Sequence, residues 1–508
     1  MFNAELLAFI LYFAVVLGIG IVFFFRSKGG GDREYFLGGR KMGPWVTAMS
    51  AQASDMSGWL LMGFPGSILA FGLGKVWIGI GLAVGTTLNW ILVAARLRRF
   101  SAAANDSITL PQYLSNRFAA KSPALQIICA IIFLVFFTIY VASGFVAGGT
   151  VFSSIIPGLA GKDGLAMGIF AVLLIIYTFL GGYKAVCWTD FVQGIMMLCA
   201  LLAVPILMVK AGTIDPSLAE KAITSATAEY SFTTKIFSAT PQEIISGLAW
   251  GFGYFGMPHI LVRFMGIRSS KLVKKSATVA IIWVFLSLGA AMIMAWLARM
   301  LVLPDGTSVG EALLAADSQK TVFIYLSEHL FPPFIAGILL SAIIAAAMST
   351  ADSQLLVASS SFTSDIYESV LNKKATNRQT IVVARICVII VAIVAYIIAS
   401  IRGKAADAIM TLVDDAWGGF GAAFGPVILL SLYWRRMTYK GAVAGVVGGA
   451  AVDVLWLIFL TDRTGIYELF PGFIAGLICC VIFTLIDKEP SEEVKAVYDK
   501  GISAGEEQ

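Results

Sequence analysis

The chain has 508 residues, of which 58% are hydrophobic and only 13% are charged, whereas soluble domains carry about 25% charged residues. A soluble fold of this length has too little interior to hide so much apolar surface, so the composition excludes an ordinary soluble protein. The formal net charge of +5 is no sign of nucleic-acid binding, because the basic residues lie in short loops between apolar runs. These runs are about 20 residues long and do not alternate with period two, which favours membrane helices over a β-barrel.

Thirteen apolar segments are predicted to cross the membrane, which makes the chain an all-α polytopic membrane protein. The first segment is too long for the core of a signal peptide and is predicted to be a true span. Two longer loops, near 211–241 and 304–333, are predicted to carry short surface helices. The predicted spans are 5–25, 44–73, 76–95, 124–152, 166–185, 190–210, 242–264, 277–303, 334–358, 380–401, 407–433, 439–460 and 468–486.

The basic residues predict the orientation, because lysine and arginine favour cytoplasmic loops. Most of the 36 Lys and Arg residues fall in alternate loops, with the clearest clusters at 96–99 and 435–436. This asymmetry predicts an N-terminus outside the cell and a C-terminus in the cytoplasm.

Ten of the predicted spans divide into two groups of five. Because five is odd, the second group enters the membrane in the direction opposite to the first, which is the topology of an inverted repeat. The predicted units are an N-terminal span with its loop (1–43), a first repeat (44–235), an inverted second repeat (236–433), two C-terminal spans (434–486) and a cytoplasmic tail (487–508).

In inverted-repeat transporters the binding site is formed by interrupted helices. The first helix of each repeat here contains residues that favour a break. In the first repeat they are Gly58, Gly63, Pro65 and Gly66, and in the second Gly251, Gly253, Gly256 and Pro258. Glycine also serves close packing in membrane helices, so this pattern alone leaves both interpretations open.

Asp55 is the sharpest single candidate for a functional residue. A carboxylate in the middle of a membrane span is costly and is by default a functional hypothesis. Its own segment offers no Lys or Arg to pair with, so a cation from solution is a natural partner. The alternative is a neutral or capping aspartate at the broken helix, where a half-helix N-terminus also favours negative charge.

Ala346, Ser349 and Thr350 have the i, i+3, i+4 spacing that places them on one face of the ninth span. Their hydroxyl groups can bond to their own backbone carbonyls. Alternatively, together with unwound carbonyls near Ala53 and Met56, they supply the oxygen ligands that a hard cation prefers.

Four aromatic residues lie near the predicted breaks, and a small amphiphilic ligand would use such rings as walls. They are Trp59, Tyr140, Trp250 and Tyr254. His259 is predicted to pack or bond locally, with a proton relay as the alternative, and two isolated histidines make no metal cluster. The sequence contains no phosphate-binding loop or nucleophile motif, so ATP-driven pumping and common hydrolytic chemistry have no support.

Several sequence runs together resemble one family. They are 35–40 (YFLGGR), 53–63 (ASDMSGWLLMG), 137–140 (FTIY), 188–190 (WTD), 253–256 (GYFG) with Pro258 and His259, 346–350 (AAMST) and 419–426 (GFGAAFGP). Over residues 5–485 the chain resembles the sodium/solute symporter family, and specifically its sodium/proline branch in bacteria.

The resemblance implies a transporter rather than an enzyme, with a leucine-transporter-like five-plus-five inverted repeat in a bacterial inner membrane. It implies uptake of L-proline with sodium by alternating access. Sodium would be held by the carbonyls of Ala53, Met56 and Ala346 and the hydroxyls of Ser349 and Thr350. Asp55 would be essential for sodium binding, directly or indirectly. The proline pocket would be lined by Ser57, Trp59, Tyr140, Trp250, Tyr254 and Pro258, with Arg40 and Asp190 near the cytoplasmic entrance.

Two departures from the family pattern are expected to matter. Asp352 stands where a serine is expected, close to the predicted sodium hydroxyls, and Asp414-Asp415 replaces an uncharged pair. These carboxylates either add a second cation site, with Asp352 as the candidate ligand, or alter the ion preference, or face water near a helix end.

Three rival functions stay open at this point. Relatives carry other small solutes on the same scaffold, related membrane modules are fused to sensor kinases, and a membrane enzyme or respiratory subunit is a third class. The short tail argues against the sensor, and no cofactor motif supports the enzyme. The partners expected are proline, sodium and the lipid bilayer, with no nucleic acid, and the oligomeric state is left open with a monomer as the simplest case.

Overall fold

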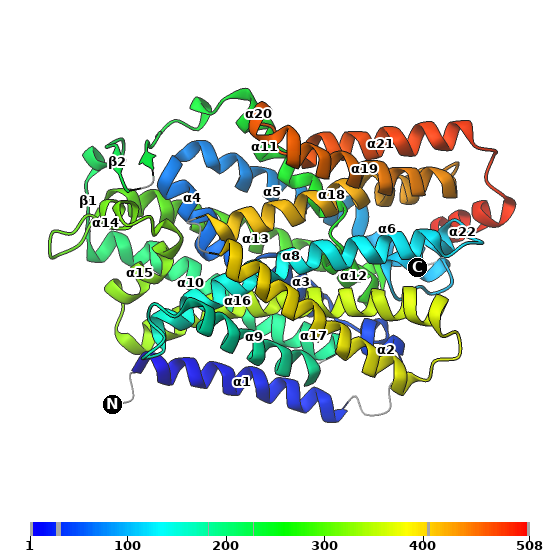
Figure 1. Cartoon of the computed structure of the whole chain (residues 1–508), viewed down its shortest axis with the longest axis horizontal. Helices are drawn as coiled ribbons and strands as arrows, with labels where there is room; N and C mark the ends of the chain where they lie inside the picture. The colour runs from blue at the N-terminus through cyan, green and yellow to red at the C-terminus, as the bar shows by residue number, and fades with distance from the viewer. Residues whose placement is uncertain (1–3, 27–31, 181, 227, 404–406, 505–508) are drawn as a thin grey trace.

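The computed structural model describes residues 4–26, 32–180, 182–226, 228–403 and 407–504. The long helices run roughly along the longest axis of the molecule (Figure 1). The α-helices are α1 Ala4–Arg26, α2 Asp32–Leu37, α3 Pro44–Asp55, α4 Phe64–Phe71, α5 Val76–Leu88, α6 Ala95–Ala103, α7 Leu110–Arg117, α8 Ala124–Ile155, α9 Asp163–Leu180, α10 Tyr183–Ala211, α11 Pro241–Ala249, α12 Pro258–Gly266, α13 Val273–Met300, α14 Val309–Ala315, α15 Val322–Leu330, α16 Pro333–Ser360, α17 Asn377–Arg402, α18 Ala408–Tyr433, α19 Tyr439–Phe459, α20 Thr461–Thr464, α21 Leu469–Ile486 and α22 Glu492–Ser503.

Short elements complete these helices. The π-helical segments are η2 Trp59–Gly63, η4 Asn89–Ala94 and η10 Ser361–Leu371. The 3-10 segments are η1 Gly38–Arg40, η3 Leu73–Lys75, η5 Pro216–Leu218, η6 Ile236–Ser238, η7 Trp250–Phe255, η8 Ser270–Leu272 and η9 Gln319–Thr321. Two small antiparallel ladders pair β1 Thr213–Ile214 with β4 Leu301–Val302, and β2 Ile223–Thr224 with β3 Glu229–Tyr230.

Ten helices in the described residues are long and apolar enough to cross a membrane. They coincide with ten of the predicted spans, and the predicted surface helices in the two long loops are also present as η5, η6, α14 and α15. The other three predicted spans, 44–73, 166–185 and 242–264, do not meet that criterion. The first and third are interrupted, and the middle one is a shorter apolar helix. The structure therefore supports a multi-pass helical membrane fold without fixing the number of crossings at thirteen.

Burial separates central from peripheral helices. The most apolar windows of α16 and α18 are each 83% buried, whereas those of α1 and α19 are 28% buried. Large apolar side chains stay exposed along the peripheral helices, for example Ile10 on α1 and Ile458 on α19. In water such surface would be unfavourable, so these faces are suited to lipid. Helices α16 and α18 are therefore the helices best shielded from lipid.

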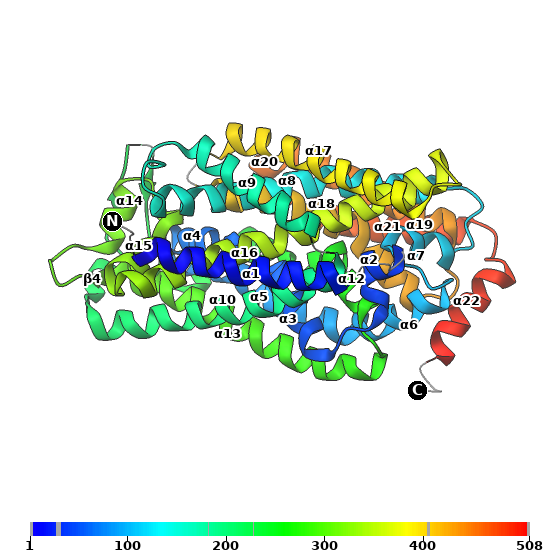
Figure 2. The ribbon, with the colours of Figure 1, turned by 90° about the horizontal axis from the view of Figure 1, so that it is seen from below.

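The molecule has two distinct ends, which Figures 1 and 2 show from two sides. One end holds the start of α1, the short helices α14 and α15 and the strands, and is called the α14 end. The opposite end holds α2, the C-terminal part of α6, α7 and α22, and is called the α22 end.

Both helices predicted to be interrupted are broken. Helix α3 ends at Asp55, and Met56 leaves the helical region with φ −83° and ψ 78° before the chain resumes as η2 and α4. Helix α11 tightens into η7, and Met257 is extended, with φ −77° and ψ 106°, before α12 begins at Pro258. A residue that precedes proline avoids helical geometry, which explains the second break locally.

Candidate ion and substrate site

The break after α3 gathers polar and aromatic groups around one backbone carbonyl. The carbonyl of Asp55 accepts hydrogen bonds from the Ser57 backbone N–H at 3.0 Å, the Trp59 indole N–H at 3.3 Å and the Tyr140 hydroxyl at 3.4 Å. All four residues are buried. The freed carbonyl of the unwound segment is thus satisfied by a backbone N–H and a side chain of its own segment and by a side chain of α8.

The carboxylate of Asp55 links the two broken helices. The Tyr254 hydroxyl of η7 donates to Asp55 Oδ2 at 2.6 Å. The other oxygen, Oδ1, is buried and has no hydrogen-bond partner among the described residues. A buried carboxylate with a free oxygen is suited to a cation, because an unpaired buried charge is otherwise strongly unfavourable.

A compact cluster of oxygen atoms lies where α3 meets α16. Ser349 Oγ donates to the carbonyl of Ala53 at 2.8 Å and lies 3.2 Å from that of Ala346, while Thr350 Oγ1 lies 3.4 Å from the Ala53 carbonyl. The hydroxyls therefore reach across to a second helix as well as back to their own. Met56 marks the break, but no described hydrogen bond ties its carbonyl to this cluster.

The predicted aromatic residues form a continuous wall on the η7 side. The rings of Trp250 and Tyr254 pack against Trp417 of α18, with centroids 6.3 Å and 5.0 Å apart. The Trp417 indole N–H donates to the Trp250 carbonyl at 2.8 Å. Sequence reasoning missed Trp417 as a wall residue, although it stands just before the glycine-rich run 418–425 that lets neighbouring elements approach α18.

Pro258 and His259 have local roles in the fold. Pro258 is buried at the first position of α12, where its missing N–H is harmless. His259 is buried against the rings of Phe137 and Tyr140, at centroid distances of 5.7 Å and 6.2 Å. The predicted packing of His259 is observed, while neither ring nitrogen has a hydrogen-bond partner among the described residues.

Asp190 belongs to a buried ion pair that the sequence analysis did not foresee. Arg263 of α12 lies 3.2 Å from Asp190 Oδ2 on α10, and both side chains are fully buried. The Ser50 hydroxyl donates to the same carboxylate oxygen at 2.6 Å, and Arg263 also donates to Ser50 at 3.1 Å, to the His259 carbonyl at 3.0 Å and to Ser353. The sequence did contain a signal for this pair, because Arg263 lies inside the predicted span 242–264. The network ties α3, α10, α12 and α16 together.

Arg40 is separate from this pair and lies in the loop before α3, at the α22 end. Its guanidinium donates to Asp106 Oδ1 at 2.8 Å, to Ser101 Oγ at 3.0 Å, and to the carbonyls of Met265 at 2.6 Å and Ser107 at 2.8 Å. Burial lowers the pKa of Arg40 to about 10, which leaves it charged. Arg40 thus fastens this loop to the turn after α6 and to the end of α12.

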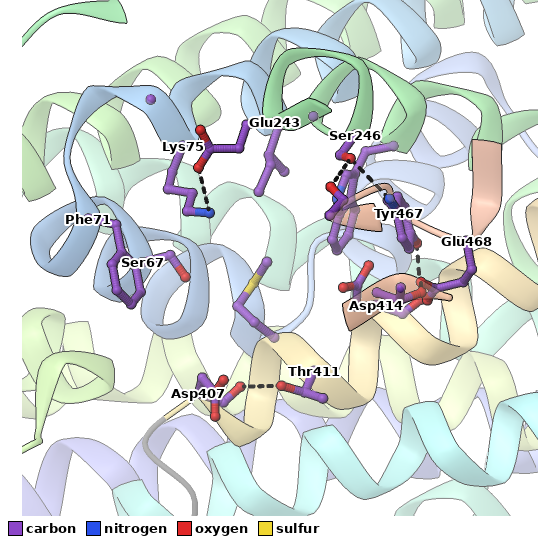
Figure 3. Close-up of a pocket in the computed structure, with 17 residues that line it drawn as sticks. Ser67, Phe71, Lys75, Glu243, Ser246, Asp407, Thr411, Asp414, Tyr467 and Glu468 are labelled. Atoms are coloured by element: carbon purple, nitrogen blue, oxygen red, sulfur yellow. Dashed lines mark hydrogen bonds and ion pairs between the residues drawn. The ribbon is translucent and has the colours of Figure 1, made fainter. Parts of the chain in front are cut away.

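The two sets of unexpected carboxylates lie in different places. Asp352 is buried on α16, accepts from Ser353 at 3.3 Å through Oδ1, and has no described partner at Oδ2. Asp352 therefore adjoins the network of Asp190 and Arg263. Asp414 lines a cavity of about 340 Å³ between α4, α11, α18 and α20, which we call the vestibule (Figure 3).

Sequence comparison identifies close relatives. The profile of the sodium:solute symporter family matches residues 35–449. The chain is 42% identical over 504 residues to sodium/proline symporter 2 of Staphylococcus saprophyticus, covering 97% of this chain and 94% of the relative. It is 42% identical over 487 residues to the sodium/proline symporter of Escherichia coli, covering 96% and 94%. It is 43% identical over 470 residues to the high-affinity proline transporter of Bacillus subtilis, covering 91% and 94%.

Two solved transporters share the fold. A sodium-coupled sialic acid symporter in an outward-open state matches with a TM-score of 0.73 and 20% identity, over 96% of this chain and 99% of that one. Mhp1, a nucleobase-cation-symport-1 transporter, matches with a TM-score of 0.53 and 13% identity, over 92% and 98%. The extent of the profile match and the identity to full-length relatives decide the assignment: the chain belongs to the sodium:solute symporter family.

Proposed function

We propose that this protein is a secondary transporter that takes up L-proline together with sodium by alternating access. Relatives about 40% identical over nearly the whole chain are named as sodium/proline symporters or proline transporters. The observation that carries the proposal is the oxygen cluster that joins the break after α3 to α16. A cation bound there would fix the unwound segment, which in turn shapes the aromatic pocket beside it.

The oxygen cluster suits sodium in ligand type. Hard cations take carbonyl, hydroxyl and carboxylate oxygens, and Ala53, Ala346, Ser349 and Thr350 supply the first two kinds within hydrogen-bond distance of one another. Met56 would add its carbonyl when the break rearranges around the ion. Asp55, two residues after Ala53, would supply the negative charge, directly or through the field at the break.

The proposed pocket among the aromatic side chains would suit a small zwitterion with an apolar ring. Ser57, Trp59, Tyr140 and Tyr254 surround the Asp55 region, and Trp250 and Pro258 extend the wall along η7 and α12. Proline's carboxylate would meet backbone N–H groups at a half-helix terminus, while its ring would pack among the aromatic side chains. Only a few polar groups are needed to fix the orientation of such a ligand.

The finer architecture is part of the same proposal. We place thirteen crossings in the membrane, with the two interrupted helices each counted once and α9 included. The first repeat would span 44–235 and the inverted second repeat 236–433. The α14 end would face outward and the α22 end the cytoplasm, because the basic clusters 96–99 and 435–436 belong to the α22 end.

Two buried arginines would then lie on the cytoplasmic side of the pocket. The pair of Arg263 with Asp190 joins four helices, so opening a path to the cytoplasm requires its rearrangement. Arg40 would act nearer the entrance by holding its loop against the end of α12. Asp352 next to this pair would offer an additional site for a cation, and Asp352→Asn would change the ratio of sodium to proline.

Binding of labelled proline to the purified protein, with sodium or with choline in its place, tests the proposal. Sodium-dependent binding is expected, and equal binding in choline would count against coupling. Ser349→Ala should raise the sodium concentration for half-maximal binding by about tenfold or more, because even groups that only support metal ligands contribute 10–100-fold. Ser341→Ala is the matched control, since Ser341 is buried on the same helix and bonds only to the Gly337 carbonyl, at 2.7 Å, among the described residues.

A panel of competing solutes separates proline from other substrates. Proline should displace the label, whereas sugars, sialic acid and hydantoins should not. Displacement by one of these instead would keep the sodium-coupled mechanism and replace the substrate.

A further inference from the structure

A group of carboxylates lies beside the vestibule and has no role in the proposed sodium and proline sites. It comprises Asp414 and Asp415 on α18, Asp453 on α19 and Glu468 just before α21. Figure 3 shows Asp414, Tyr467 and Glu468 together at one wall of the vestibule. Asp453 and Glu468 are 0% and 1% exposed, so these groups are shielded although the vestibule is next to them.

Two of these groups, Asp453 and Glu468, converge on Gly418 of α18. A methyl group placed on Gly418 would lie 3.1 Å from Asp453 Oδ1 and 3.4 Å from Glu468 Cγ. Asp414 precedes Gly418 by one helical turn and therefore shares its face. The carboxylates of Asp453 on α19 and Glu468 before α21 thus meet over this small residue, one helical turn from Asp414.

Positive charge does not balance this group. Asp415 has an ion-pair partner, Arg402 of α17, at 2.7 Å. Among the described residues, by contrast, neither carboxylate oxygen of Asp453 has a hydrogen-bond partner, nor does Oδ1 of Asp414 or Oε1 of Glu468. The second oxygen of Glu468 accepts from Thr461 at 3.0 Å.

The other charged groups around the vestibule do not change this balance. Lys75 forms an ion pair with Glu243 of α11 at 3.8 Å, so its positive charge is already balanced by that carboxylate. Asp407 adds a further, exposed carboxylate to the wall of the vestibule. Asp453 and Glu468 are almost fully shielded, whereas Asp414 is partly exposed to the vestibule. Neighbouring carboxylates disfavour one another's ionisation, most strongly where they are shielded from water. The described residues contain no group of three acidic, histidine or cysteine side chains arranged to hold a metal ion. A proton on one of these carboxyl groups removes a negative charge and needs no set of metal ligands.

We propose that Asp414, Asp453 and Glu468 form a proton-binding site that is loaded from the vestibule. Burial, with a smaller contribution from repulsion by Asp415, raises the pKa of Glu468, which lies just before the apolar helix α21. The site is joined to the aromatic wall through its neighbour Tyr467. That residue donates to the Asp414 carbonyl at 3.0 Å, and its ring stacks on Trp250 with centroids 5.3 Å apart.

This connection gives the proton a predictable effect. Deprotonation would leave like charges facing one another between α18, α19 and α21, and their repulsion would loosen the stack of Tyr467 on Trp250. Because linkage is reciprocal, a proton that favours the packed wall also favours any ligand that needs it. The predicted effect on proline rests on the function and orientation proposed above, whereas the proton site itself does not.

Infrared difference spectra of the purified protein in vesicles test the site directly. Bands of protonated carboxyl groups should appear as the pH is lowered from about 8 to about 5, and part of this signal should be lost in Asp453→Asn/Glu468→Gln. Asp352→Asn, which removes a different buried carboxylate, should retain that part. Absence of titrating bands in the wild-type protein would overturn the site, and this readout does not depend on any variant that fails to fold.

Proline uptake by intact cells at fixed sodium concentration tests the effect. The half-saturation concentration of the wild type should rise about fivefold or more as external pH rises through the same range. The double variant mimics the protonated site and should stay near the low-pH value, while Asp407→Asn should follow the wild type. A double variant with unchanged pH dependence would contradict the proposal. If sodium at constant pH removed the bands of this site, the site would hold sodium and the proton assignment would be wrong.

A failure of the proton site and a failure of the proposed transport function give different experimental results. Sodium-dependent binding of labelled proline without any titrating carboxyl signal would remove the proton site and leave the transport function intact. Carboxyl titration in a protein that binds no proline would do the reverse.

Discussion

The two interrupted helices differ in how each break is specified. Helix α11 begins with a capping box, in which Thr240 Oγ1 accepts from the Glu243 N–H and Glu243 accepts from the Thr240 N–H, and the chain breaks before Pro258. Helix α3 begins after Gly43 without a side-chain cap. Its break has no proline, and the groups that satisfy it include Tyr140 and Tyr254 from other elements. The second break is therefore encoded locally, and the first is held by tertiary contacts.

This difference bears on which break responds to ligands. A break fixed by proline persists whatever surrounds it. A break fixed by distant side chains changes when those side chains acquire another partner, and the same segment carries Ala53 and Asp55. We therefore expect α3 to be the element that senses the ion and α11–α12 to be the frame against which it moves.

Arg263→Met should give the largest effect, because it separates this frame from α3 and α10. Removing one partner of a buried ion pair leaves an uncompensated charge and typically destabilises by about 3–5 kcal/mol. Thermal unfolding of the purified protein measures this loss of stability. Adding Asp190→Asn to the Arg263→Met variant should restore a large part of the lost stability. Arg435→Met is the control, since the pair of Arg435 with Asp499 is about half exposed and such pairs contribute about 1 kcal/mol or less. Equal losses in both variants would show that the buried pair is not special.

Tyr254→Phe should give the next largest effect and acts on the break after α3. It removes the hydroxyl that donates to Asp55 Oδ2 at 2.6 Å, and a hydrogen bond to a charged group contributes about 1.5–3 kcal/mol. Sodium titration of proline binding should show an apparent affinity about tenfold weaker or more. Tyr396→Phe on α17, whose hydroxyl donates to the Gly164 carbonyl at 3.0 Å, should leave the sodium affinity unchanged. An unaffected sodium titration in Tyr254→Phe would mean that the frame does not position Asp55.

The same distinction explains what the sequence could predict. Features encoded locally were accessible: the apolar spans, the break before Pro258, and Asp55 as a costly intramembrane carboxylate. The partners of Asp190 and Trp250 were not, because Arg263 and Trp417 lie about 70 and 170 residues away along the chain and reach them only through helix packing. The convergence of Asp453 and Glu468 on Gly418 was hidden for the same reason. The number of crossings was obscured because broken helices have short apolar runs.

Thr240→Ala should give the smallest effect and tests the local encoding of α11. Loss of an N-terminal cap costs about 1 kcal/mol, and the loss should appear in thermal unfolding while the sodium titration stays unchanged, because the cap lies one helix away from the break at Met257. Thr376→Ala is the matched control, since Thr376 forms the same capping box with Gln379 at the start of α17. Similar losses of stability in both variants, with normal sodium dependence, are expected if α11 serves as a frame. A changed sodium affinity in Thr240→Ala alone would show that the start of α11 moves with the ion, and α3 would then not be the only element that senses it.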